Sequence, residues 1–143
     1  MRRAAIVTAA RSWVGTPYRH QASLKSVGCD CLGLLRGVWR DVVGDEPERP
    51  PAYSRDWAEA SGHEALRDAA ARRLVQVPDG RWQAGDVLLF RWREHLPAKH
   101  CAVATGEGTM VHAHEGASVA EVAIAPWWDR HIAGVFSFPG AEP

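Results

Sequence analysis

The chain has 143 residues, of which 46% are hydrophobic and 24% are charged, and its formal net charge at pH 7 is +0. These values are ordinary for a globular protein, and the length predicts a single domain over residues 1–143. The balanced charge excludes a bulk field that would recruit nucleic acid or an anionic membrane, and no nucleic-acid-binding motif occurs. Three cysteines are too few for a disulfide scaffold, and no apolar stretch is long enough to predict membrane insertion.

The N-terminal segment "MRRAAIVTAARSWVG" predicts an amphipathic helix. Arg11 interrupts its apolar run early, which argues against a signal peptide and leads us to expect synthesis in the cytoplasm. The helical period turns four side chains toward the core, namely Ile6, Ala10, Trp13 and Val14.

A second helix is predicted over residues 31–43, with Gly44 as its stop signal. Its apolar stripe consists of Cys31, Leu35, Val38, Trp39 and Val42. A proline-rich loop, "GDEPERPPAYSRD", follows it. A third helix is predicted after Ser61, because Ser61 and Glu64 have the spacing of a capping box. Its apolar positions are Leu66, Ala70 and Leu74.

From about residue 84 the pattern changes to short strands separated by turns that contain glycine. The predicted strands are "DVLLFRW", "HCAVAT", "TMVHAH", "VAEVAI" and "GVFSF". Trp127 and Trp128, which lie between the last two strands, are expected to belong to the core, with the wall of the substrate groove as the alternative. Helices followed by strands predict an α+β fold, in which N-terminal helices pack on a C-terminal, mostly antiparallel sheet.

Two cysteines flank an aspartate at the start of the second predicted helix, in the sequence "GCDC" at 28–31. Asp30 occupies the N-cap position, which makes Cys31 the first helical residue. The free N–H groups and the dipole at a helix start favour a thiolate, the reactive form of cysteine. Cys29 lies outside the helix and gains less. Both cysteines could instead be small buried apolar residues, as most free cysteines are, so a nucleophile needs a base as further support.

Two histidines on neighbouring strands supply such a base. Alternation places His100 on one face of its strand, and His112 shares a face with His114 on the next strand. An even register around the turn at 106–108 brings His100 and His112 to the same side of the sheet, opposite or diagonal to each other. One imidazole could then accept the thiol proton while the other orients it. His114 shares this face and could touch a substrate.

Four motifs in this order resemble those of the NlpC-type peptidoglycan endopeptidases, a papain-like group of cysteine peptidases. Within that family they are similar to the cell wall peptidases of phages and gene transfer agents. The motifs are "WVGTPYRH" at 13–20, "GCDCLGLLRGVWR" at 28–40, "QAGDVLLF" at 83–90 and "HCAVATGEGTMVHA" at 100–113. The resemblance covers nearly the whole chain and implies a papain-like fold.

The resemblance implies that Cys31 is the nucleophile, His100 the general base and acid, and His112 the residue that orients His100. It further implies that Tyr18 reaches over the cysteine and that Asp30 faces the substrate, where it could recognise a free peptide amine. The backbone N–H of Cys31 would donate to the oxyanion. The sequence departs from the family at residue 32, where leucine replaces the usual serine, and in "RHQAS" after the tyrosine. No metal or organic cofactor is implied.

The implied reaction is hydrolysis of an amide bond in peptidoglycan stem peptides, between D-γ-glutamate and diaminopimelate, through a thioester. Some family members cut cross-links instead. Because the substrate lies outside the cytoplasmic membrane, we expect the protein to be carried in a phage-like particle. There it would contact a tail-tip, hub or baseplate protein and act in the periplasm or cell wall of the recipient cell.

Three alternatives remain open at this stage. The same fold could act as an amidase, acyltransferase or thioester hydrolase on another substrate. It could also be a degenerate relative inside a particle that binds without catalysing a reaction. A zinc-binding structural module is the third, although a Cys-x-Cys pair at a helix start lacks the usual knuckle spacing. Its potential ligands are Cys29, Cys31, His100, Cys101, His112 and His114.

Overall fold

A computed structural model describes residues 1–50, 52–53 and 62–143 of the chain. The helices are α1 (Arg3–Arg11), α2 (Cys31–Val42), α4 (Ala65–Arg73) and α5 (Pro126–Arg130). A small two-stranded sheet consists of β1 (Ser23–Leu24) and β2 (Gly28–Cys29). The main sheet consists of β3 (Val75–Gln76), β4 (Val87–Phe90), β5 (His100–Gly106), β6 (Thr109–His112), β7 (Ala120–Ala123) and β8 (Ile132–Ser137). No helix within the described ranges is long and apolar enough to span a membrane.

The main sheet has six strands in the order β3-β8-β4-β5-β6-β7, and every neighbouring pair is antiparallel. The predicted α+β fold is therefore confirmed, and all five predicted strands are present. Sequence patterns missed β1, β2 and β3, which have only two residues each, and also the short helix α5. Such short segments carry no measurable hydrophobic period.

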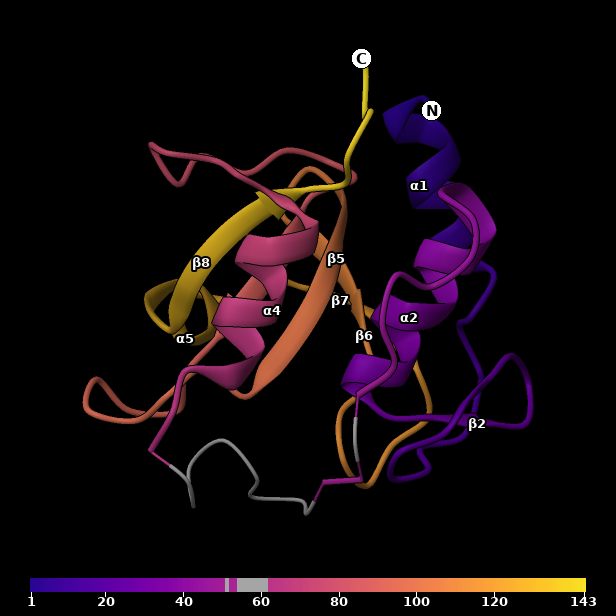
Figure 1. The fold of residues 1–143 in the computed structure, drawn as a ribbon, viewed down its shortest axis with the longest axis horizontal. Helices are drawn as coiled ribbons and strands as arrows, with labels where there is room; N and C mark the ends of the chain where they lie inside the picture. The colour runs from indigo at the N-terminus through magenta and orange to yellow at the C-terminus, as the bar shows by residue number, and fades with distance from the viewer. Residues whose placement is uncertain (51, 54–61) are drawn as a thin grey trace.

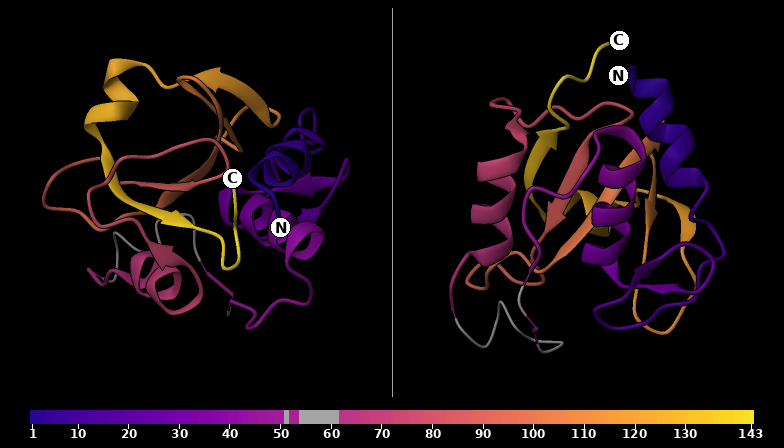
Figure 2. Two further views of the ribbon diagram at one scale, coloured as in Figure 1. Left: turned by 90° about the horizontal axis from the view of Figure 1, so that it is seen from above. Right: turned by 45° about the vertical axis from the view of Figure 1, so that its right-hand side comes forward.

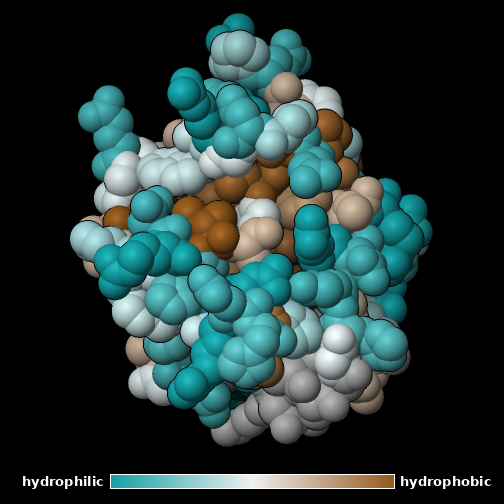
Figure 3. All heavy atoms as spheres, turned by 90° about the vertical axis from the view of Figure 1, so that its left-hand side faces the viewer, coloured by the Kyte–Doolittle hydropathy of each residue, from teal (hydrophilic) through white to brown (hydrophobic). Residues whose placement is uncertain are grey.

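The sheet has an apolar core on each face. On one face α1, α2 and α4 pack against it, as Figures 1 and 2 show, and their buried side chains join those of the strands in one cluster. The other face holds a smaller cluster that includes Phe90 and Met110, with Trp128 of α5 packed against it. On the side of the molecule where β8 and α5 lie, hydrophobic residues gather in a hollow ringed by hydrophilic ones (Figure 3).

The packing of α1 on α2 corrects two of the predicted helix faces. Ile6, Ala10 and Trp13 are buried as predicted, but Val14 is 48% exposed because α1 ends at Arg11 and the chain turns away. On α2 the buried residues are Gly33, Leu34, Gly37 and Val38, so the helix is rotated from the predicted stripe. Leu35, Trp39 and Val42 are only half-buried.

The rotation of α2 follows from a glycine contact. A Cβ atom at Gly37 would lie 1.9 Å from Cζ2 of Trp13, so only glycine lets the tryptophan ring rest against the helix backbone. The Trp13 indole Nε1–H then donates to Asp41 Oδ2 at 3.2 Å. A ring packed this closely against a helix requires a small residue at the contact. The pattern of apolar residues in the sequence does not predict such a contact.

The third predicted helix is present as α4, and its apolar residues Leu66, Ala70 and Leu74 are buried. The capping box is wrong, because Glu64 itself is the N-cap residue and makes no side-chain cap. Its carboxylate instead accepts a hydrogen bond from the Ala98 N–H at 3.0 Å and one from Arg91 Nη1 at 3.1 Å. Ser61 lies outside the described residues.

Candidate active site

Cys31 is the first residue of α2, as predicted, and Asp30 caps the helix. Asp30 Oδ1 accepts a hydrogen bond from the Gly33 N–H at 2.7 Å. A Cβ atom at Gly33 would lie 1.8 Å from the carbonyl oxygen of Ala22, so the glycine lets the preceding loop cross the first turn of the helix. The Cys31 N–H has no acceptor within the helix, because the first N–H groups of any α-helix lack one.

His100 and His112 form a hydrogen-bonded pair. The register pairs Val103 with Val111 and Ala104 with Met110, which confirms the even register predicted from the sequence. The two histidines therefore lie diagonally on one face, with His100 Nε2 and His112 Nδ1 3.0 Å apart. Both side chains are buried. Burial, followed by the charges of His100 and His114, lowers the pKa of His112 to about 3. His112 is thus neutral, and a protonated His100 can donate to its Nδ1.

The Cys31 thiol lies where β5 begins, half-buried and 3.7 Å from the carbonyl oxygen of Lys99. Hydrogen bonding from Cys101, hydrogen bonding from His100 and the charge of His100 hold the pKa of the Cys31 thiol well below its usual value. Burial and the nearby Asp30 carboxylate oppose them but do not prevail. A thiolate on Cys31 is therefore the favoured form beside His100.

The other two cysteines remain thiols. Burial, followed by the charges of Asp30 and Cys31, raises the pKa of Cys29 to about 12. The hydrogen bond to Cys31, together with burial, raises the pKa of Cys101 well above its usual value. The Cys31 carbonyl oxygen, 3.2 Å from Cys101 Sγ, is a second acceptor toward which the single S–H of Cys101 can turn. The three cysteines are all free, so the structure distinguishes them by their surroundings and not by disulfide pairing.

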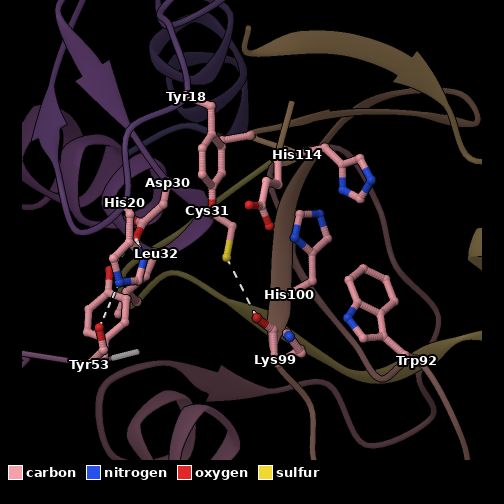
Figure 4. A pocket seen from close by; sticks show the side chains of 12 residues that line it. Tyr18, His20, Asp30, Cys31, Leu32, Tyr53, Trp92, Lys99, His100 and His114 are labelled. Carbon is pink, nitrogen blue, oxygen red and sulfur yellow. Dashed lines mark hydrogen bonds and ion pairs between the residues drawn. The ribbon is translucent and has the colours of Figure 1, made fainter. Parts of the chain in front are cut away.

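The Cys31 thiol and the His100 ring line a pocket of about 390 Å³. Figure 4 shows Tyr18 pointing toward Cys31 from the loop before β1, with Trp92 and His114 on the His100 side. His20, Leu32 and Tyr53 lie on the opposite side of the cysteine. The remaining lining residues are Asp30, Lys99, Ala113 and Glu115.

The two predicted substrate-binding residues, Tyr18 and Asp30, differ in the solvent exposure of their side chains. Tyr18 is half-buried and reaches over the cysteine, in the position expected for it. Asp30 lines the pocket, but its side chain is only 4% exposed. Its Oδ2 accepts hydrogen bonds from the Gln21 N–H at 2.7 Å and from the Tyr53 hydroxyl. A substrate amine at Asp30 would have to share that oxygen, so the role of Asp30 in binding stays a prediction.

A comparison with family models shows the family to which the chain belongs. The model of the NlpC/P60 family matches residues 15–136, which include Cys31, His100 and His112. The chain belongs to the NlpC/P60 family.

Individual relatives agree with the family match. Murein DD-endopeptidase MepH of Escherichia coli (strain K12) is 27% identical over 123 residues, which are 85% of this chain and 40% of MepH. The solved NlpC/p60 domain of the peptidoglycan hydrolase SagA has a TM-score of 0.68 at 24% identity and covers 96% of this chain and 100% of that domain. An NlpC/P60 protein from Bacillus cereus ATCC 10987 has a TM-score of 0.66 at 19% identity, over 95% of this chain and 40% of that one. The structural matches establish an NlpC/P60 fold.

The packing of Trp92 and Trp128 on His100 was not predicted from the sequence, which assigned Trp128 to the core or to the wall of the groove. Trp92, two residues beyond the end of β4, stacks on His100 with ring centroids 5.5 Å apart, and Trp128 packs against the same ring at 5.5 Å. Trp127 was expected in the core but is 44% exposed, stacked on His131. The sequence signal for Trp92 was its place at the end of the predicted strand "DVLLFRW", close to where β5 begins.

Proposed function

We propose that this chain is a cysteine endopeptidase that hydrolyses an amide bond in peptidoglycan stem peptides. The observation that carries the proposal is the 3.0 Å contact between His100 Nε2 and His112 Nδ1, next to a cysteine whose thiolate is stabilised at the start of α2. A neutral His112 can hold the His100 ring in one orientation while His100 exchanges a proton with Cys31. Membership of the NlpC/P60 family supports the substrate class.

In the acylation half-reaction, the Cys31 thiolate attacks the carbonyl carbon of the scissile amide. The developing oxyanion accepts a hydrogen bond from the Cys31 N–H, which the helix leaves free. The His100 imidazolium then donates its proton to the leaving nitrogen, so that the C–N bond breaks and a thioester forms.

In the deacylation half-reaction, neutral His100 accepts a proton from water as the water oxygen attacks the thioester carbon. The C–S bond breaks, the peptide leaves as a carboxylic acid, and the Cys31 thiolate with protonated His100 is restored. Trp92, stacked on His100, shields one face of the imidazole. The steps require only groups that line the pocket, together with His112 behind it.

The bond we propose is that between D-γ-glutamate and diaminopimelate, as the sequence resemblance implies. Digestion of purified muropeptides should therefore yield fragments cut within one stem peptide, with a new amine on diaminopimelate. Liquid chromatography with mass spectrometry of the fragments measures this directly.

A second candidate bond is favoured by the 27% identity to a murein DD-endopeptidase. This bond is the cross-link between two stem peptides. Its cleavage would separate cross-linked dimers into monomers with intact stems. If monomers are the product, the chain is still a peptidoglycan endopeptidase, but the cleaved bond is the cross-link and not the bond proposed above. Unchanged muropeptides, together with hydrolysis of another amide or thioester, would overturn the peptidoglycan assignment and favour the amidase or acyltransferase alternative.

We also propose that the enzyme is delivered to the wall by a phage-like particle, in contact with a tail-tip, hub or baseplate protein. The resemblance of the four motifs to phage and gene-transfer-agent peptidases supports this carriage. Mass spectrometry of purified particles should detect the chain in a fixed ratio to tail proteins. Its absence from particles, with secretion by intact producer cells, would contradict the proposal.

A further inference from the structure

Three histidines gather on one face of the sheet beside the pocket. One ring nitrogen each of His100, His112 and His114 lies within 4.8 Å of the other two, and among the described residues this is the only such group of three or more potential metal ligands. His112 is the last residue of β6 and His114 follows two residues later, so the two form a His-x-His pair. His100 lies on the neighbouring strand β5. Cys29, Cys31 and Cys101 do not belong to this group, which separates it from the zinc module considered from the sequence.

The spacing of the three rings suits a small divalent ion. Zn²⁺ binds imidazole nitrogen at about 2.0–2.1 Å, so tetrahedral geometry places two ligand nitrogens about 3.3 Å apart. The His100 and His112 nitrogens, 3.0 Å apart, need to separate only slightly, but both rings must turn so that the nitrogens, which face each other in the hydrogen bond, point to a common ion. The His114 ring nitrogen lies within 4.8 Å of the other two, and because this residue is exposed its side chain has room to adjust to an ion.

Access and ligand number are also suitable. His100 and His114 both line the pocket, so an ion and a coordinating water can reach them from solvent. Three imidazoles with one open position are a ligand set that Zn²⁺ and related transition ions accept. His112 is buried behind them, its ring nearly parallel to that of His114 at 5.6 Å.

We propose that His100, His112 and His114 bind a divalent transition-metal ion of the Zn²⁺ class, with water from the pocket as the fourth ligand. Binding releases the proton shared between His100 Nε2 and His112 Nδ1, because both nitrogens then coordinate the ion. On the proposed function, those nitrogens belong to the general base and its orienting partner. The ion is therefore an inhibitor of the peptidase and not its cofactor.

Zinc binding is tested first without reference to activity, by calorimetric titration of the folded protein with Zn²⁺ in a buffer that does not chelate metals. We expect one ion per chain in the wild type and in Cys31→Ser. His114→Ala should weaken binding at least about tenfold, since loss of a mere supporting hydrogen bond to a metal ligand already costs about 10- to 100-fold. His95→Ala, which removes an exposed histidine outside the cluster, should bind as the wild type does.

Co²⁺ loading reports the ligand type, because a thiolate ligand adds a charge-transfer band that imidazoles do not give. We expect visible d–d bands without that band. Inhibition of peptide cleavage by zinc is measured relative to the zinc-free activity of the same variant. We expect the inhibitory zinc concentration to rise in His114→Ala by the same factor as the dissociation constant for zinc. Binding that persists in His114→Ala and disappears in Cys31→Ser would overturn the histidine site. Binding without any peptidase activity would refute the proposed function and leave the metal site standing.

Discussion

On the proposed function, we expect Cys31→Ala to abolish peptidoglycan cleavage while the fold remains intact. We expect kcat to fall by at least about 10⁴-fold, as loss of a covalent nucleophile does in other hydrolases. The reason is that no other cysteine can replace it, since Cys29 and Cys101 have raised pKa values and are buried. Release of muropeptide fragments over time measures the loss, and circular dichroism verifies the fold.

The matched control for this substitution is Cys29→Ala, two residues away. Cys29 lies in the core and outside the pocket lining, so this variant should keep most of the activity once any loss of stability is allowed for. A folded Cys31→Ala protein with a tenth or more of wild-type activity would refute the thioester mechanism. So would equal losses in the two variants at equal stability.

His100→Ala should reduce kcat by at least about 10³-fold and also change the chemistry of Cys31. The hydrogen bond from His100 and its charge are two of the three influences that lower the pKa of the Cys31 thiol. Without them, only the hydrogen bond from Cys101 opposes burial and the Asp30 carboxylate, so that pKa should rise and alkylation of Cys31 by iodoacetamide should require a higher pH. Mass spectrometry of the Cys31 peptide across pH measures the shift.

His112 provides the comparison for His100. His112→Ala should lower kcat by about 10²- to 10⁴-fold, because the imidazole it orients is still present. His112→Gln, whose side-chain oxygen can accept the hydrogen bond from His100, should recover part of the loss.

An alkylation profile that is identical in wild type and His100→Ala would show that His100 does not support the thiolate.

Local patterns sufficed for much of the site. The first helical position of Cys31 follows from the N-cap preference of Asp30, and the pairing of His100 with His112 follows from the strand period and a short turn. Both rest on contacts close in sequence, where periodicity determines geometry.

Other parts of the site depend on tertiary contacts that no period reveals. The helix α2 turns Gly33 and Gly37 inward because a loop and the Trp13 ring approach its backbone, which overrides the apolar stripe. Cys31 and His100 lie on opposite faces of the sheet and meet only because His100 is the first residue of β5. Trp92 likewise reaches His100 from a neighbouring strand end.

Stoichiometric alkylation of Cys31 tests the central claim most directly, that one thiolate carries the whole activity. Aliquots treated with increasing iodoacetamide near neutral pH are divided between peptide mass spectrometry and a muropeptide cleavage assay. We expect residual activity to fall in a straight line to zero as the labelled fraction of Cys31 rises to one, with Cys29 and Cys101 unlabelled. Substantial activity in a protein whose Cys31 is fully alkylated would contradict the claim.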